Sequence, residues 1–385
     1  MKKDSRVKAV ISLDAVEHNF REMRKNIAEE TKMIAVIKAD AYGHGAVPVA
    51  HLIEDYDYIW GFAAATAEEA IHLREAGITK PILILGIVFD EYFPELVRYE
   101  IRPAVCEYEE ASKLSDEAVL QKKTVHIHIA LDTGMTRIGF ADAQENVEEI
   151  KKISELPNLE IEGMFTHFAR ADEYDRSPAM VQLERYLDFS RRVEEAGVEI
   201  PLHHCSNSAG IIRMPEANLN IVRAGITIYG IYPSSEVERD IVKLEPVMEL
   251  KSHVTYVKDV PAGAAISYGG TFKTEHTTRI GVVPYGYADG FFRCLSNRCA
   301  LMTKEGPAPQ RGKICMDMCM IDLTGKMGVD VGSEVEVFGK QNSINDLAAL
   351  AGTIPYELTC AVSKRVPRIY IRNGKVVEKE LLLRG

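Results

Sequence analysis

A lysine near the start of the chain has the setting of a reactive amine. Lys38 follows the apolar run MIAVI and precedes the polar turn ADAYGHG, so we expect it at the end of a buried strand. A buried ammonium group is costly unless it is paired or deprotonated, and such a lysine is suited to forming a Schiff base with a carbonyl compound. Considered alone, Lys38 is better explained as a strand-end residue whose amine reaches solvent.

Two later segments have the composition of a phosphate site. SNSAG (206–210) and RAGI (223–226) combine small residues, a hydroxyl group and backbone N–H donors. Each is a weak signal alone, because short loops of this kind are often ordinary turns. Together with Lys38 they predict pyridoxal 5'-phosphate, a cofactor that carries both an aldehyde and a phosphate group.

These groups meet only if a barrel positions them. Between residues 32 and 225, short apolar runs alternate with helical patterns, which indicates parallel strands joined by helices. Eight such runs predict an α/β fold closed into a (β/α)8 TIM-type barrel. The runs are 33–39, 59–65, 82–86, 101–105, 125–131, 161–167, 202–206 and 220–225.

The functional end of such a barrel lies at the carboxyl ends of its strands. Lys38, His167 and Arg223 come at the ends of the first, sixth and eighth predicted strands. Ser208 follows the seventh. We therefore expect these four side chains at one mouth of the barrel.

The sequence pattern changes after residue 240. Short β runs separated by Gly and Pro follow, with one predicted helix near 344–351. We predict two domains, a barrel that binds the cofactor over 1–240 and a mainly β domain over 241–385. The opening segment RVKAVISL is a candidate strand of the second domain.

The composition favours a cytoplasmic enzyme over several other classes. The 385 residues include 46 Lys and Arg against 57 Asp and Glu, and the net charge of -11 disfavours nucleic-acid binding. No apolar run approaches the roughly 20 residues of a membrane-spanning helix, and the start lacks the apolar core of a secretion signal. We therefore expect no membrane association.

Histidines and cysteines offer a metal site as a competing interpretation. The seven cysteines lack paired C-x2-C spacing, so free thiols are the simpler interpretation. His126 and His128 share a strand face but have no apparent third ligand. The adjacent His203 and His204 are expected on opposite faces of their strand. We predict no metal.

Motifs along nearly the whole chain closely resemble those of alanine racemases, which are pyridoxal-phosphate enzymes of fold type III. They are VIKADAYGHG, DTGMTRIGF, GMFTHFA, CSNSAG, VRAGITIYG, SYGGTF, GYADG, KICMDM and PYELTCAVSKRVPR. Their number and order make the resemblance more specific than any single short pattern. It implies an isomerase that interconverts L-alanine and D-alanine, supplies D-alanine for biosynthesis and forms homodimers with shared active sites.

The resemblance assigns two acid–base groups. Lys38 would hold the cofactor as a Schiff base and act on the D face, and Tyr268 of the partner subunit would act on the L face. This suits racemisation, because a proton must leave one face of the α-carbon and arrive at the other. Tyrosine is a poor base near neutral pH, so cationic or hydrogen-bonding neighbours such as His167 and Arg223 are expected to favour its ionised form.

The resemblance also implies contacts to cofactor and substrate. Arg223 would face the pyridine nitrogen, where a group that only donates hydrogen bonds discourages protonation and limits side reactions such as transamination. Arg137 would reach the phenolic oxygen of the cofactor and the substrate carboxylate, and His167 would pack on the ring. The phosphate would be bound by Tyr42, Ser208, Gly225, Ile226 and Tyr356, and the substrate entrance would be formed by Met316, Asp317 and Tyr287.

The chain departs from the family at one informative position. Alanine racemases usually have a lysine, often carbamylated, two positions before the Asp of DTGM, where this chain has Ala130. That lysine normally helps to orient the arginine that corresponds to Arg137. We therefore expect the placement of Arg137, and with it turnover or substrate range, to differ.

Three other functions stay open, two catalytic and one non-catalytic. A racemase of serine or of a basic amino acid is the nearest alternative, although the bulk of Tyr287, Met316 and Tyr356 favours a small side chain. A decarboxylase of the same fold type normally uses a Cys-Glu pair, whereas here Met316 follows Cys315. A non-catalytic cofactor-binding protein generally lacks the β domain and its tyrosine, and both are expected here.

Overall fold

The computed structural model describes residues 6–381 and divides into two compact units. The barrel unit contains residues 17–41 and 45–244, and the β unit contains residues 6–16, 42–44 and 245–381. The division after residue 244 lies close to the predicted one after residue 240. The predicted range 1–240 differs from the structure at its start, because residues 6–16 belong to the β unit.

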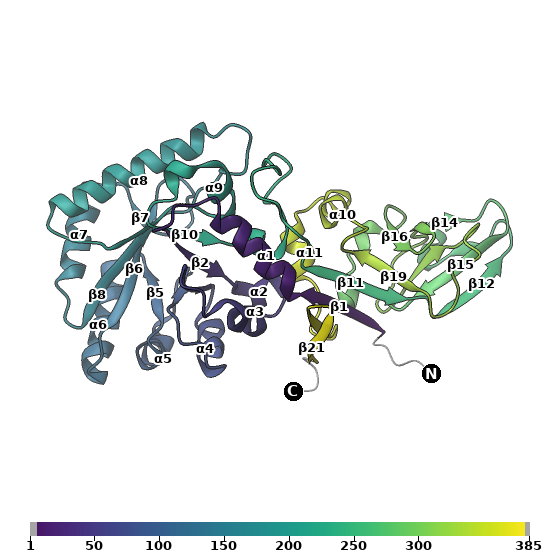
Figure 1. Cartoon of the computed structure of the whole chain (residues 1–385), viewed down its shortest axis with the longest axis horizontal. Helices are drawn as coiled ribbons and strands as arrows, with labels where there is room; N and C mark the ends of the chain where they lie inside the picture. Colours follow the sequence, from purple (N-terminus) through teal and green to yellow (C-terminus); the bar gives the residue numbers. More distant parts are fainter. Residues whose placement is uncertain (1–5, 382–385) are drawn as a thin grey trace. The chain divides into compact units, whose positions relative to one another are not determined.

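Eight parallel strands build the barrel unit, in the order β10-β2-β3-β4-β5-β6-β8-β9. Each of the eight apolar runs overlaps one of them, which confirms the predicted barrel (Figure 1). Near the two end strands, Arg223 N donates to Ser206 O at 3.0 Å, so the sheet is nearly closed. The strands are β2 (Lys32–Val36), β3 (Ile59–Ala64), β4 (Ile82–Ile84), β5 (Arg102–Val105), β6 (Val125–Asp132), β8 (Leu159–Phe165), β9 (Leu202–His204) and β10 (Ile221–Ala224), and the short β7 (Phe140–Ala141) pairs with β6.

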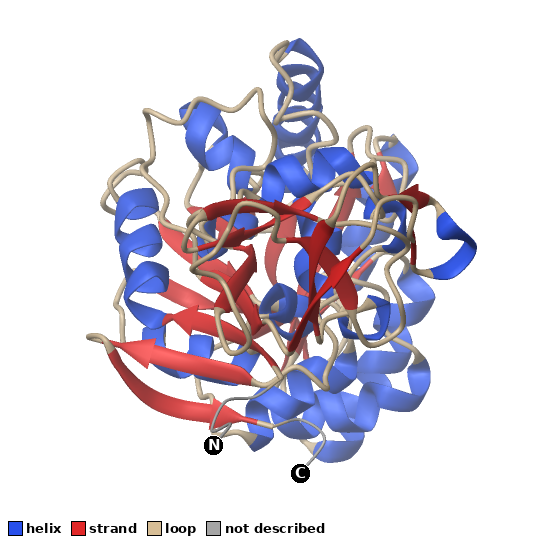
Figure 2. Ribbon diagram, turned by 90° about the vertical axis from the view of Figure 1, so that its right-hand side faces the viewer, coloured by secondary structure: helices blue, strands red, loops and turns tan. Residues whose placement is uncertain are grey.

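The helices that alternate with these strands lie around the outside of the barrel (blue in Figure 2). Helix α4 has a capping feature at each end. Thr66 Oγ1 accepts a hydrogen bond from Glu69 N, and Gly77 follows with a φ of +91°. The helices up to residue 213 are α1 (Leu13–Arg24), α2 (Lys38–Gly43), α3 (Ala46–Ile53), α4 (Ala67–Glu75), α5 (Phe93–Tyr99), α6 (Tyr108–Gln121), α7 (Gln144–Ser154), α8 (Ser177–Glu195) and α9 (Ser208–Arg213).

The first barrel strand ends earlier than predicted. β2 ends at Val36, so Lys38 is the first residue of α2 and not the last residue of the strand. Ile37, between them, is only 2 % exposed. Hydrophobicity therefore continues past the end of the strand, and an apolar run alone does not mark that end.

A seven-stranded sheet is the main element of the β unit, in the order β17-β16-β19-β11-β1-β20-β21. β1 (Val7–Ser12) lies inside this sheet, antiparallel to β11 and parallel to β20, which explains why the first residues belong to this unit. The other strands are β11 (Met248–His253), β12 (Tyr256–Val260), β13 (Ala265–Ile266), β14 (Phe272–Lys273), β15 (Thr278–Val283), β16 (Ala300–Thr303), β17 (Gly306–Pro309), β18 (Cys319–Asp322), β19 (Glu334–Phe338), β20 (Arg368–Arg372) and β21 (Lys375–Glu380).

Two α-helices follow β19 in the β unit. α10 (Ile344–Ala351) confirms the helix predicted near 344–351. α11 (Pro355–Cys360) is not predicted, because six residues are too few to show a helical period. This short helix carries Tyr356.

Candidate functional site

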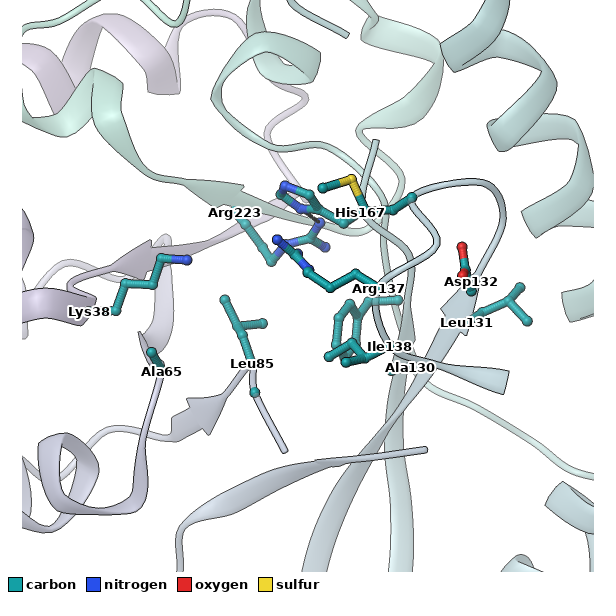
Figure 3. Close-up of a pocket in the computed structure, with 13 residues that line it drawn as sticks. Lys38, Ala65, Leu85, Ala130, Leu131, Asp132, Arg137, Ile138, His167 and Arg223 are labelled. Atoms are coloured by element: carbon teal, nitrogen blue, oxygen red, sulfur yellow. Dashed lines mark hydrogen bonds between the residues drawn. The ribbon is translucent and has the colours of Figure 1, made fainter. Parts of the chain in front are cut away.

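A cavity of about 210 Å³ lies where the barrel strands end. Lys38, Arg137, His167 and Arg223 line it, and Figure 3 shows their nitrogen-bearing ends directed toward the same space. The structure therefore brings three of the four predicted mouth residues, together with Arg137, to one cavity. The other lining residues are mainly apolar: Ala65, Leu85, Gly86, Ala130, Leu131, Asp132, Met135, Ile138 and Phe165.

Lys38 leads into a left-handed turn of the backbone. The φ angles of the next four residues, 39–42, lie between 51° and 53°. This conformation costs L-residues roughly 1–2 kcal/mol each. Asp40 holds the turn, because its carbonyl oxygen accepts from Gly45 N at 2.9 Å and its Oδ1 accepts from Ala46 N at 2.8 Å. Strained backbone of this kind is concentrated at functional sites.

Arg223 is held rigidly by its acceptors. Its Nη1 donates to the carbonyl oxygen of His204 at 2.7 Å and to His204 Nδ1 at 2.8 Å. Its Nη2 donates to Thr166 O at 2.7 Å and to Cys205 O at 3.1 Å. Burial lowers the pKa of Arg223 to about 10, so the guanidinium group stays charged at neutral pH.

A chain of hydrogen bonds continues from Arg223 through the barrel interior. His204 Nδ1 accepts from Arg223, so His204 Nε2 carries the proton and donates to His128 Nδ1 at 2.8 Å. His128 Nε2 lies 3.4 Å from Glu162 Oε2, which also accepts from Arg102 Nε at 3.0 Å. Burial lowers the pKa of both histidines and so keeps them neutral. Sequence reasoning missed this chain, because nothing local in the sequence links its five strands.

His167 is neutral in this environment. Burial, followed by the positive charges of Arg223, Arg137 and Lys38, lowers its pKa to about 3. Its Nδ1 lies 3.4 Å from Arg223 Nη2 and accepts from it, which leaves the proton on Nε2. Of the two roles expected for His167, the structure supports the hydrogen-bonding one and not the cationic one.

The loops after β9 and β10 lie together, as the phosphate-site prediction requires. Ser208 Oγ accepts from Gly225 N at 2.9 Å and lies 2.9 Å from Thr227 Oγ1. Ser208 is the first residue of α9, and Ile226 is the first residue of a 3-10 helix (Ile226–Tyr229). A serine hydroxyl beside two helix N-termini is the donor set that an anion requires.

Tyr42 and Tyr356 lie side by side within the β unit. Their ring centroids are 5.9 Å apart. Gly43 permits this approach, because a Cβ atom there would lie 2.4 Å from Thr359 O of α11. Arg368 Nε donates to Gly43 O at 3.2 Å and so also holds this segment in place. The two tyrosines that the resemblance assigns to the phosphate are therefore neighbours.

Ala130 and Arg137 both line the cavity. Ala130 lies on β6, is 2 % exposed and packs with Ala104 and Phe165. Arg137 is exposed, and within residues 6–381 its guanidinium group makes no hydrogen bond or ion pair. That the loss of the lysine changes the placement of Arg137 stays a prediction.

Tyr268 is held at the surface of the β unit, where its side chain is 68 % exposed. Ser267 before it has a φ of +62°, and Ser267 Oγ donates to Lys313 O at 2.6 Å. Gly269 and Gly270 after it have φ angles of +70° and +54°. The turn therefore presents the phenol outward and ties it to the segment that leads to Met316 and Asp317.

The predicted entrance residues come together in the β unit. Tyr287 N donates to Cys315 O, and Ala288 N donates to Met316 O, both at 3.0 Å. Tyr287 is 43 % exposed and Met316 is 53 % exposed, and the Asp317 side chain is 51 % exposed. Sequence motifs far apart in the chain thus form one surface.

The histidines of the competing metal interpretation have protein partners. His126 Nδ1 lies 3.3 Å from Glu160 Oε2. His203 Nδ1 contacts Tyr186 OH of α8 at 3.0 Å, whereas His204 faces the barrel interior, which confirms that the two point to opposite faces. Within residues 6–381 no group of side chains suits a metal ion, and the seven cysteines, from 106 to 360, are free thiols.

Within the same range, no helix combines the length and the hydrophobicity that crossing a bilayer requires.

Comparison with known proteins covers both units. Residues 11–233 match the family described as "Alanine racemase, N-terminal domain", and residues 247–370 match "Alanine racemase, C-terminal domain". The chain is 44 % identical to an alanine racemase of Clostridium tetani, over 96 % of each chain. It is 45 % identical to one of Methanococcus maripaludis, over 94 % of this chain and 98 % of that one.

Solved structures agree with these matches. An alanine racemase of Clostridium difficile superposes with a TM-score of 0.96 at 40 % identity, covering 99 % of this chain and 100 % of that one. An alanine racemase of Bacillus anthracis with bound L-Ala-P superposes with a TM-score of 0.93 at 34 % identity, covering 100 % of both chains. All four of these relatives are named alanine racemases.

Proposed function

This chain belongs to the alanine racemase family, and from that premise we propose which of its residues interconvert L-alanine and D-alanine. The reaction is an isomerisation that moves one proton between the two faces of the α-carbon. The observation that carries the proposal is the cavity on which Lys38, His167 and Arg223 converge. An amine, a hydrogen-bond donor and a fixed cation are the groups that this proton transfer needs.

The cavity and the loops beside it fit pyridoxal 5'-phosphate, the cofactor of the family. Lys38 offers an amine for the aldehyde, and the Ser208 loop offers donors for the phosphate. When bound, the cofactor withdraws electrons from the α-carbon and makes its proton acidic enough to move. We assign covalent attachment to Lys38 and the phosphate contacts to Tyr42, Ser208, Gly225, Ile226 and Tyr356.

Lys38 and Tyr268 are the proposed acid–base pair. The Lys38 amine lies at the cavity and takes or returns the proton on the D face. The lining of the cavity comes from the barrel unit, whereas Tyr268 is an exposed residue of the β unit. We therefore propose a homodimer in which Tyr268 of the partner subunit takes or returns the proton on the L face.

Arg223 and His167 set the electrostatic environment of the proposed acid–base pair, Lys38 and Tyr268. Arg223 donates hydrogen bonds and has no acceptor, so opposite the pyridine nitrogen of a bound cofactor it would disfavour protonation of that nitrogen and would moderate electron withdrawal. His167 would pack on the cofactor ring, and its Nε2 proton would stabilise the Tyr268 phenolate. Neutral His167 thus acts as a donor, while Arg223 supplies the positive charge.

Arg137 and the entrance residues select the substrate. Arg137 would bind the carboxylate of the amino acid and the phenolic oxygen of the cofactor. Met316, Asp317 and Tyr287 narrow the path to the site, which suits the methyl side chain of alanine. We further propose that the enzyme supplies D-alanine in the cytoplasm. The free cysteines would stay reduced in that compartment.

The release of Cα deuterium from labelled D-alanine and L-alanine tests the assignment. Tyr268→Phe is expected to keep the bound cofactor, visible by its absorbance, and to lose exchange from L-alanine selectively. Lys38→Ala is expected to lose covalent cofactor, which borohydride reduction and mass spectrometry detect. Tyr256→Phe, at an exposed tyrosine of the same unit, is the matched control.

Two outcomes would contradict the proposal. Equal loss of exchange from both enantiomers in Tyr268→Phe would remove the L-face assignment. Unaltered protein that binds alanine and the cofactor but exchanges neither enantiomer would be a binding protein and not a racemase.

A further inference from the structure

A buried carboxylate holds the entrance segments together. The Asp289 side chain is 0 % exposed and sits between two arginines. Arg6 donates to both of its oxygens, with Nη1 2.9 Å from Oδ2, and Arg365 Nε donates to Oδ1 at 2.7 Å. Gly286 N donates to Oδ2 at 3.0 Å. Burial opposes the charge of Asp289, but these donors lower its pKa overall, so it is ionised at neutral pH.

Arg365 extends this arrangement to the entrance. Its Nη2 donates to Asp317 Oδ1 at 2.7 Å while its Nε stays on Asp289. One planar guanidinium group therefore fixes the direction of both carboxylates. The Arg365 side chain is 28 % exposed and the Asp317 side chain is 51 % exposed, so the contact lies at the rim.

The same carboxylate fixes the backbone before Tyr287. Gly286, which donates to Asp289, is packed so closely that a Cβ atom would lie 2.3 Å from Met316 O and 2.4 Å from Cys315 O. The next two amides donate to these same carbonyl groups. The spacing between Tyr287 and Met316 is therefore set by backbone contacts, and Asp289 fixes one side of them through its hydrogen bond from Gly286 N.

We propose that Asp289 and Arg365 are positioning residues that set the size limit for the amino acid admitted to the site. Arg365 does so by holding Asp317, and Asp289 by holding Arg365 and Gly286. The inference rests on the proposed placement of Tyr287, Met316 and Asp317 at the substrate entrance. A half-exposed ion pair adds little to folding, so its main effect is expected in substrate selection.

Racemisation of alanine and of the larger serine, measured as kcat and KM, tests the inference. Arg365→Gln is expected to raise the ratio of kcat/KM for serine to that for alanine on the order of tenfold, mainly through KM. Asp317→Asn should give the same change. Combining Asp317→Asn with Arg365→Gln should change the ratio little further, because each substitution breaks the same Arg365–Asp317 contact. Arg365→Lys should lie in between, and Lys364→Gln, at the exposed neighbour, is the control.

Thermal unfolding and the absorbance of bound cofactor separate positioning from a purely structural role. If Arg365→Gln unfolds at a lower temperature but keeps the selectivity ratio of the unaltered enzyme, the inference is overturned. If Arg365→Gln does not fold, Asp317→Asn, at the exposed end of the ion pair, tests the inference instead. An unchanged ratio of kcat/KM for serine to that for alanine in Asp317→Asn also overturns the inference. If the unaltered protein racemises no amino acid, the proposed function fails first.

Discussion

Arg223 stays charged while the imidazoles around it are neutral. Burial lowers the pKa of Arg223 only to about 10, but it brings the pKa of His167 to about 3 and that of His204 well below its usual range. The difference follows from the high intrinsic pKa of guanidinium, which leaves a wide margin above neutral pH. The cavity therefore combines the fixed positive charge of Arg223 with neutral imidazole groups beside it.

Acidification is expected to destabilise the protein through these histidines. His128 and His204 are 0 % exposed and have lowered pKa values, so below about pH 6.5 the unfolded chain binds more protons than the folded one. The free energy of unfolding should fall by up to about 1.4 kcal/mol per pH unit for each. Urea unfolding between pH 7.5 and 5 at one protein concentration measures this.

Replacing an exposed histidine provides the control for this pH dependence. His51→Gln should keep the slope of unfolding free energy against pH, because His51 is solvated in both states. An unfolding free energy that does not change between pH 7 and 5 would show that the buried imidazoles are not neutral in the folded protein.

Ala130→Lys tests the missing partner of Arg137. In bicarbonate, which allows carbamylation, the new side chain is expected to orient Arg137 and lower KM for alanine by roughly 2- to 10-fold, about the effect of one charge-assisted contact. Steady-state kinetics with and without bicarbonate measure the effect, and Ala130→Met controls for the added bulk. Unchanged kinetics would mean that Arg137 is already oriented by other means.

At the scale of elements, the left-handed turn after Lys38 and the helix α11 depend on one glycine. Gly43 has a φ of +82° and lies against the backbone of α11. Gly43→Ala is expected to lower the free energy of unfolding by about 2–4 kcal/mol, because it adds a steric clash to an unfavourable φ. Chemical denaturation measures the loss.

A second glycine separates the steric clash at Gly43 from the cost of placing an alanine at a positive φ. Gly77 has a φ of +91°, but a Cβ atom there would meet nothing within 4 Å. Gly77→Ala should therefore cost only about 1 kcal/mol. Equal losses in the two variants would show that the approach of Gly43 to α11 is not limiting.

At the scale of the whole molecule, shared active sites predict complementation between inactive variants. A dimer of one Lys38→Ala chain and one Tyr268→Phe chain would contain one intact site and one doubly altered site. After unfolding and refolding an equal mixture, random pairing should restore about 25 % of the activity of the unaltered enzyme. Activity in both directions, compared with each variant refolded alone, measures this.

The complementation also distinguishes the two possible origins of Tyr268. If each chain used its own tyrosine, no hybrid would contain an intact site, and the refolded mixture would be as inactive as its components. Size-exclusion chromatography of the mixture shows whether dimers have formed.

Much of this protein follows from its sequence alone. The apolar runs predict all eight barrel strands, since a parallel strand buried on both faces must be continuously apolar. The ends of those runs predict that Lys38, His167 and Arg223 share a cavity, because parallel strands end at the same side. The motifs identify the family, and the comparisons confirm it.

The tertiary structure decides what depends on distant partners. β1 joins the β unit because its partners, β11 and β20, lie more than 200 residues away in the chain. The neutral state of His204 and the links from Asp289 to Arg365 arise from burial and from contacts across the fold, which no local pattern encodes.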